Sequence, residues 1–218
     1  MKRVIKKQLK EDEFVSTLTK IFRFVQKRSK EIIIAAAAVG FIAILYAGLR
    51  LIQVNNMRKE SRMVTRLLDL RADLNTKPEN LAEIEKLAGK GKFARLAYVL
   101  TATYWVEQGD MEKAKAALAK VGGGTKDFIY YQAQDLLARV LFREKQYDQA
   151  ITIYDQVFKE SPKDYCLDVI LFHKAEVLEG KGETKEALAL YKKIQEDFPQ
   201  SYYGYDASGR ARKLESGL

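Results

Sequence analysis

The sequence predicts an all-α protein: an N-terminal single transmembrane helix followed by a right-handed α-solenoid of helical hairpins with a C-terminal capping helix. Two observations predict it. Residues 32–49 form an uncharged, mostly apolar run, and small and bulky residues then recur every 36 or 37 positions. The composition agrees, because only 3 prolines and 13 glycines interrupt 218 residues rich in good helix formers.

The apolar run is long enough to cross a membrane. With Arg50, Leu51 and Ile52 it reaches 21 residues, or about 31 Å of helix, close to the ~30 Å hydrocarbon core of a bilayer. A cleaved signal peptide usually has a shorter apolar core of about 7–15 residues and a cleavage site. A buried core helix would carry a polar face. We therefore expect a retained transmembrane helix at 32–54.

The charge is concentrated before this run. Residues 1–30 carry +7 of the net charge of +9, which leaves +2 for the folded part and gives no indication of nucleic-acid binding. A basic tail beside an apolar run instead indicates an anionic lipid surface. Lys and Arg are more numerous before the apolar run than in residues 51–70 after it. This bias predicts a cytoplasmic N-terminus and an exported C-terminal domain. Within the tail, 1–31, an amphipathic helix is expected, either as an interfacial or docking helix or as a lead-in to the span. Its apolar positions are Phe14, Leu18, Ile21 and Val25.

The repeat is present in two registers. One runs through Ala114, Ala150 and Ala187, each followed four residues later by a bulky side chain, and the other lies twelve residues earlier at Ala102, Ala138 and Ala175. Small residues let the two helices of a hairpin approach closely, and bulky ones fill the space between hairpins. This pattern resembles the tetratricopeptide motif. It predicts juxtamembrane helices at 55–91, three tetratricopeptide-like repeats at 92–199 and a capping helix at 200–218.

Residues for catalysis are scarce. Cys166 is the only cysteine, so no intrachain disulfide forms, and His173 is the only histidine, so no histidine-based triad or metal cluster can be assembled. The glycine–lysine strings at 89–92 and 180–182 lack the phosphate-loop pattern and fall at helix ends. We expect no enzyme activity, no cofactor, no metal and no small-molecule substrate, and His173 at the surface or in a groove.

Protein binding is the better hypothesis. The first helices of the hairpins are expected to line a concave groove, where Arg139 and Arg143 could bind a carboxylate and Phe142 and Phe172 an apolar side chain. Alternatively, the arginines pair with Asp135 and Glu144 and the phenylalanines are core. The candidate groove residues are Val99, Thr103, Gln132, Asp135, Arg139, Phe142, Arg143, Phe172 and Glu176.

The combination of a basic tail, one apolar span and helical repeats resembles the ancillary subunit of the bacterial Sec translocon. The segments FARLA at 93–97, EQGD at 107–110 and KA at 113–114 look like its first repeat. The resemblance implies a single-pass protein of the bacterial inner membrane with a periplasmic domain. Its expected partners are translocon subunits, chaperones or exported clients. FPQS at 198–201 and RKL at 212–214 also look like repeat proteins of envelope assembly, so a structural scaffold is the alternative.

Overall fold

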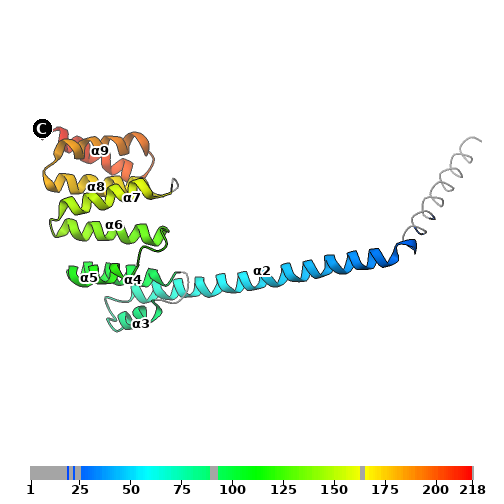
Figure 1. Cartoon of the computed structure of the whole chain (residues 1–218). Helices are drawn as coiled ribbons and strands as arrows, with labels where there is room; N and C mark the ends of the chain where they lie inside the picture. Colours follow the sequence, from blue (N-terminus) through cyan, green and yellow to red (C-terminus); the bar gives the residue numbers. More distant parts are fainter. Residues whose placement is uncertain (1–18, 20–21, 23–25, 89–92, 163–164, 218) are drawn as a thin grey trace, which may run out of the picture. The chain divides into compact units, whose positions relative to one another are not determined.

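A computed structural model describes residues 19, 22, 26–88, 93–162 and 165–217 (Figure 1). Throughout these residues the regular secondary structure is helical. The chain divides into two units, Met1–Lys59 and Glu60–Leu218, which are described separately below. Phe14, Leu18, Ile21 and Val25 of the predicted amphipathic helix lie outside the described residues.

The first unit contains the start of α2, a helix of 44 residues that runs from Ser29 to Ala72. By length and composition α2 can cross a membrane, and it is the one such helix among the described residues. Its large apolar side chains, including Ile34, Phe41 and Leu49, are exposed. At the end of the apolar run, Arg50 donates a hydrogen bond of 3.2 Å from Nε to the Tyr46 hydroxyl.

The second unit begins with a leading helix pair. The last turns of α2 pack on α3, Asn80–Leu87, through the buried side chains of Leu67, Leu70 and Ile84. Ala97 of the next helix closes the same cluster. Outside this core, the Arg66 guanidinium binds both carboxylate oxygens of Glu83, at 2.8 and 2.9 Å.

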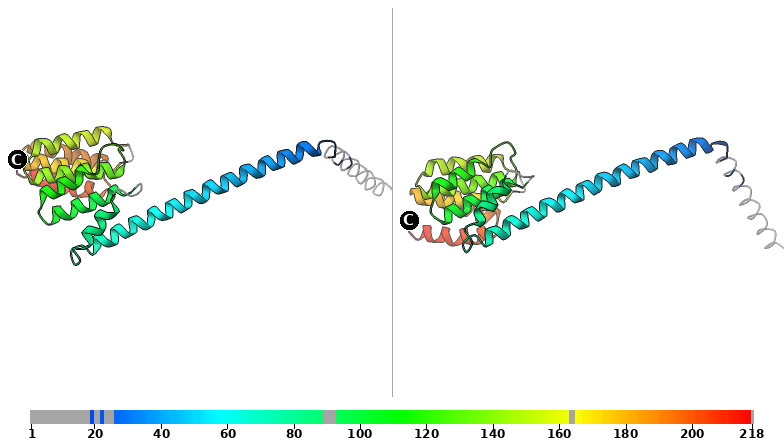
Figure 2. Two further views of the ribbon diagram at one scale, coloured as in Figure 1. Left: turned by 60° about the horizontal axis from the view of Figure 1, so that its bottom comes forward. Right: turned by 90° about the horizontal axis from the view of Figure 1, so that it is seen from below.

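Three hairpins and a final helix follow, stacked as Figure 2 shows. The helices are α4 Arg95–Glu107, α5 Met111–Ala119, α6 Phe128–Arg143, α7 Tyr147–Glu160, α8 Leu167–Lys181, α9 Thr184–Asp197 and α10 Tyr202–Glu215. Each odd-numbered helix from α5 to α9 packs against the even-numbered helix before it. The predicted all-α fold with a tetratricopeptide-like solenoid is confirmed.

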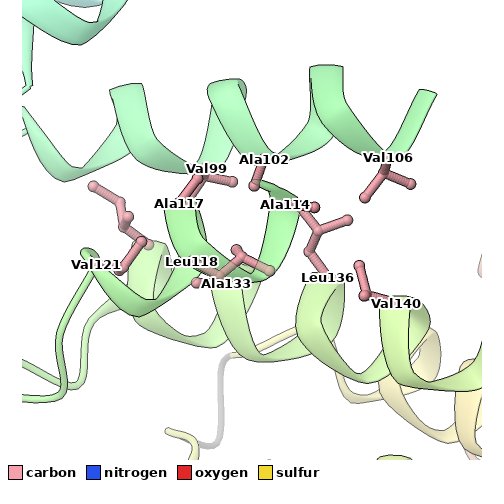
Figure 3. Close-up of a cluster of buried hydrophobic side chains, with 11 residues drawn as sticks. Val99, Ala102, Val106, Ala114, Ala117, Leu118, Val121, Ala133, Leu136 and Val140 are labelled. Atoms are coloured by element: carbon pink, nitrogen blue, oxygen red, sulfur yellow. The ribbon is translucent and has the colours of Figure 1, made fainter. Parts of the chain in front are cut away.

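Both repeat registers are buried, as their spacing predicted. Ala102, Ala138 and Ala175 are fully inaccessible, and so are Ala114, Ala150 and Ala187 on the partner helices. Figure 3 shows the first such contact, where Ala102 of α4 lies close to Ala114 of α5 and Leu118 extends toward α6. The backbone repeats as well, because the turns inside the three hairpins each hold a positive φ, at Gly109, Lys145 and Gly182.

Candidate functional site

The first helices of the hairpins form one wall of the solenoid, and a cavity of about 360 Å³ lies along it. Its lining comes from α4, from α6, from the chain just before α8 and from the first turn of α8. The lining residues are Val99, Thr103, Val106, Glu107, Phe128, Gln132, Asp135, Leu136, Arg139, Arg143, Tyr165, Cys166 and Val169. We call this cavity the concave groove.

One end of the concave groove is aromatic and apolar. Phe128, the first residue of α6, is 57% exposed, and its ring centroid lies 5.9 Å from that of Tyr165. Asp127 places it there by capping α6, since its side chain accepts a hydrogen bond of 3.1 Å from the Tyr130 amide. An exposed aromatic ring held by a cap is suited to contact an apolar group of a partner.

Two arginines from consecutive turns of α6 face the groove, but they differ in their bonding. Arg143 donates a hydrogen bond of 3.0 Å from Nη1 to the carbonyl of Val106, near the end of α4. Arg139 is exposed, and no hydrogen bond or ion pair joins it to the described residues. Arg143 therefore helps hold α4 against α6, whereas the guanidinium of Arg139 is available to an anionic group.

The Asp135 side chain connects the concave groove to α7 of the same hairpin and to α8 of the next. Its Oδ1 lies 2.7 Å from Nδ1 of His173 on α8 and accepts a hydrogen bond of 3.2 Å from the Tyr154 hydroxyl on α7. Burial raises the pKa of Tyr154, and the Asp135 carboxylate adds to the rise. We expected His173 at the surface or in a groove. Its side chain is 14% exposed, so it is not a surface residue; it packs between Tyr154 and Tyr203 and contacts Asp135 of the groove wall.

Six of the nine candidate residues line the concave groove: Val99, Thr103, Gln132, Asp135, Arg139 and Arg143. The other three lie elsewhere. The Phe142 ring packs on Tyr147 and over Gly180, where an added Cβ would meet it at 2.6 Å. Phe172 is 3% exposed and contacts Tyr191 and Tyr203. Glu176 pairs with Arg210 of α10 at 3.1 Å.

These positions favour the alternative reading for the two phenylalanines, which lie in the cores of the second and third hairpins. The alternative ion pairs of the arginines are not among the contacts of the described residues, because Glu144 instead binds Lys115 at 2.9 Å. Sequence reasoning missed the other lining residues, which are Val106, Glu107, Phe128, Leu136, Tyr165, Cys166 and Val169. Tyr165 and Cys166 precede α8 and Val169 lies in its first turn, and no repeat position indicates that these three side chains reach the groove.

The stacked hairpins and the concave groove define an α-solenoid, a class whose members use extended concave surfaces for binding. The chain belongs to the tetratricopeptide repeat-like domain family, whose model matches residues 23–201. Repeats of this kind typically bind other proteins and serve as non-catalytic scaffolds. No curated protein matches the sequence significantly.

Several solved structures resemble the chain, including the following two. One contains the nearly identical TPR-like repeats of a putative kinesin light chain from Podosopora anserina, with 13% identity and a TM-score of 0.58, covering 72% of this chain and 86% of that chain. The other is MamA of AMB-1, with 15% identity and a TM-score of 0.45, covering 71% and 87%. At such identities the first likeness shows the fold alone.

Proposed function

We propose that the protein is a membrane-anchored adaptor that binds a segment of a partner protein in the concave groove. The observation that carries this proposal is the exposed Arg139 guanidinium, unpaired among the described residues, beside an apolar wall that includes Phe128 and Leu136. Such a surface suits a polypeptide that presents a carboxylate next to an apolar side chain.

The remaining groove residues support the same geometry. Arg143 and Asp135 are held by bonds to Val106 and His173, so the walls on both sides of Arg139 are fixed before a partner arrives. Side chains that are already ordered lose less conformational entropy on binding.

The proposed anchor is α2. A run of exposed large apolar side chains is unusual in a soluble monomer and is typical of a segment that contacts lipid or another protein. With the basic tail before it, the helix favours a protein of the inner membrane whose repeats lie on the exported side. There, the adaptor would serve protein translocation or periplasmic chaperoning.

Paired alanine variants test the groove. The full chain should lose co-purified partner, by about tenfold or more, when Phe128→Ala and Arg139→Ala are combined, because hot-spot side chains each contribute about 1–2 kcal/mol or more. Phe158→Ala combined with Arg212→Ala is the matched control, since both side chains are exposed but lie outside the groove. If both double variants capture the same amount of partner at unchanged thermal stability, binding of the partner in the concave groove is refuted.

Topology is tested separately. A reporter enzyme active only outside the cytoplasm, fused after Leu218, should be active, and sodium carbonate should leave the chain in the membrane. A cytoplasmic C-terminus would remove the exported-side proposal, and release by carbonate would remove the anchor.

A structural scaffold is the second candidate. Tyr202 and Tyr205 of α10 are 75% and 82% exposed at the end of the solenoid, where a permanent neighbour could pack. A stoichiometric complex that survives purification and is lost in Tyr205→Ser would favour the scaffold. Transient capture that depends on Arg139 would favour the adaptor.

A further inference from the structure

The first hairpin has a second cavity that shares no lining residue with the concave groove. This side crevice, of about 400 Å³, lies between α4, α5 and the end of α3. Its lining includes Tyr98, Thr101, Trp105, Lys113, Ala117 and Lys120, and Glu85 of α3 stands at its edge.

The second hairpin shows that the crevice is not a general feature of the fold. Gln134, Ile153 and Gln156 occupy the positions equivalent to Tyr98, Ala117 and Lys120 in the 36-residue register. They line the corresponding space between α6 and α7, which has no measurable volume, about 0 Å³. The side crevice therefore depends on particular residues of the first hairpin, above all on Ala117 where the next hairpin has isoleucine.

A second observation points to a ligand. Thr101 is 3% exposed, lines the crevice, and its hydroxyl is buried without a hydrogen-bond partner among the described residues. Leu137 holds the equivalent position in the next hairpin and packs as an apolar residue. A buried hydroxyl without a partner is costly, so a group that accepts its hydrogen bond would bind favourably here.

The charges of the crevice are mixed but mostly positive. Nζ of Lys113 lies 4.2 Å from the Trp105 ring centroid and also pairs with Asp110 at 2.8 Å. Nζ of Lys120 lies 5.9 Å from the Tyr98 centroid and pairs with no carboxylate of the described residues. Glu85 is the acidic residue of the lining.

We propose that the side crevice is a second docking site, which takes an apolar side chain flanked by carboxylates on a segment of a partner polypeptide. The apolar side chain fills the space that Ile153 fills in the second hairpin and packs against Trp105. A carboxylate pairs with Lys120, and Thr101 donates its hydrogen bond to the bound segment. This site is independent of the concave groove.

Trp105 is the only tryptophan of the chain, so its fluorescence reports on the side crevice directly. The probe is a blocked hexapeptide, Glu-Glu-Leu-Phe-Glu-Glu, titrated into the detergent-solubilised full chain. It should change the emission of Trp105 saturably, and the same peptide with glutamine in place of glutamate should bind at least fivefold more weakly. Phenylacetate tests for a free small acid. Saturation by phenylacetate as tight as that by the peptide would overturn the polypeptide assignment.

Variants separate the two sites. Ala117→Ile should abolish the response because it fills the crevice with the residue that the second hairpin carries, and Lys120→Gln should weaken binding of the acidic peptide about threefold or more. Arg139→Ala, in the concave groove, should leave it unchanged. If Ala117→Ile fails to fold, Ala116→Leu replaces it. An unchanged response in the folded crevice variant, or no saturable response in the wild type, would overturn the proposal. Neither result bears on the concave groove.

Discussion

Nδ1 of His173 lies 2.7 Å from Oδ1 of Asp135, a contact that joins α8 to α6 across 38 positions of sequence. The Tyr154 hydroxyl donates to the same oxygen from α7. One carboxylate at the wall of the concave groove therefore fastens three helices of two hairpins. The geometry of the groove depends on contacts made on the side away from a partner.

Removing the imidazole should weaken this junction. We expect His173→Ala to lower the free energy of unfolding by about 1–3 kcal/mol, because the half-buried Asp135 loses a hydrogen-bond partner and a space is left beside Tyr203. Urea denaturation measures the change. Lys193→Ala is the control: it breaks an exposed ion pair with Asp197 and should cost less than about 0.5 kcal/mol. Similar losses in the two variants would contradict the role of His173.

Replacing either of two glycines of α10 by alanine should change the stability of the protein, but in opposite directions. A Cβ at Gly204 would lie 1.9 Å from the carbonyl oxygen of Phe198, so α10 must shift and stability should fall by about 2 kcal/mol or more. Gly209 has open space around it, and there alanine should stabilise the helix by roughly 0.5–1 kcal/mol. Thermal denaturation of both variants checks the close approach of Gly204 to the Phe198 carbonyl. If Gly204→Ala is as stable as the wild type, that close approach is contradicted.

The unpartnered hydroxyl of Thr101 predicts a stabilising substitution. Thr101→Val replaces it by a methyl group of similar shape, and removing an unsatisfied buried group should raise the free energy of unfolding by about 1 kcal/mol. Thr103→Val is the comparison, because the Thr103 hydroxyl donates to the carbonyl of Val99 at 2.9 Å. A loss of stability in Thr101→Val would show that the hydroxyl has a partner in solution.

Low pH should destabilise the first turn of α6, because it protonates the capping carboxylate of Asp127. Burial alone would favour the neutral acid, but the Tyr130 amide and the Arg95 guanidinium outweigh it and hold the pKa of Asp127 below its usual value. A carboxyl whose pKa is depressed by folding stabilises the fold above its unfolded pKa of about 3.9, and that contribution is lost as the pH falls through the folded pKa.

Asp127→Asn keeps a capping side chain but removes this titration. Between about pH 5 and pH 3 the free energy of unfolding should therefore fall less steeply in the variant than in the wild type. Equal slopes would mean that Asp127 does not couple to folding.

The repeats were predictable because burial acts on the same helix position in each hairpin. Ala102, Ala138 and Ala175 are spaced by 36 and 37 residues and all are inaccessible, so the spacing alone located the contacts between helices. The contact between His173 and Asp135 was not predictable. It joins different positions of different hairpins, and the periodic pattern carries no information about such a pair.

The groove was predictable only where the helix register alone decides which way a side chain points. Val99, Gln132 and Arg139 follow it, whereas the register did not reveal that Phe142 of α6 packs over Gly180 of α8 in the next hairpin. The side crevice escaped prediction for a different reason. It comes from the small size of Ala117, and a missing side chain gives no positive signal in a sequence.

Site-specific photocrosslinking tests the groove most directly. A photoreactive residue replaces Gln132, inside the concave groove, or Gln156, an exposed position on α7 outside it, in the full chain within native membranes. Adducts of defined mass should form from position 132, disappear with Arg139→Glu, and be absent from position 156. Adducts that form equally from both positions, or that persist in Arg139→Glu, would contradict binding in the groove.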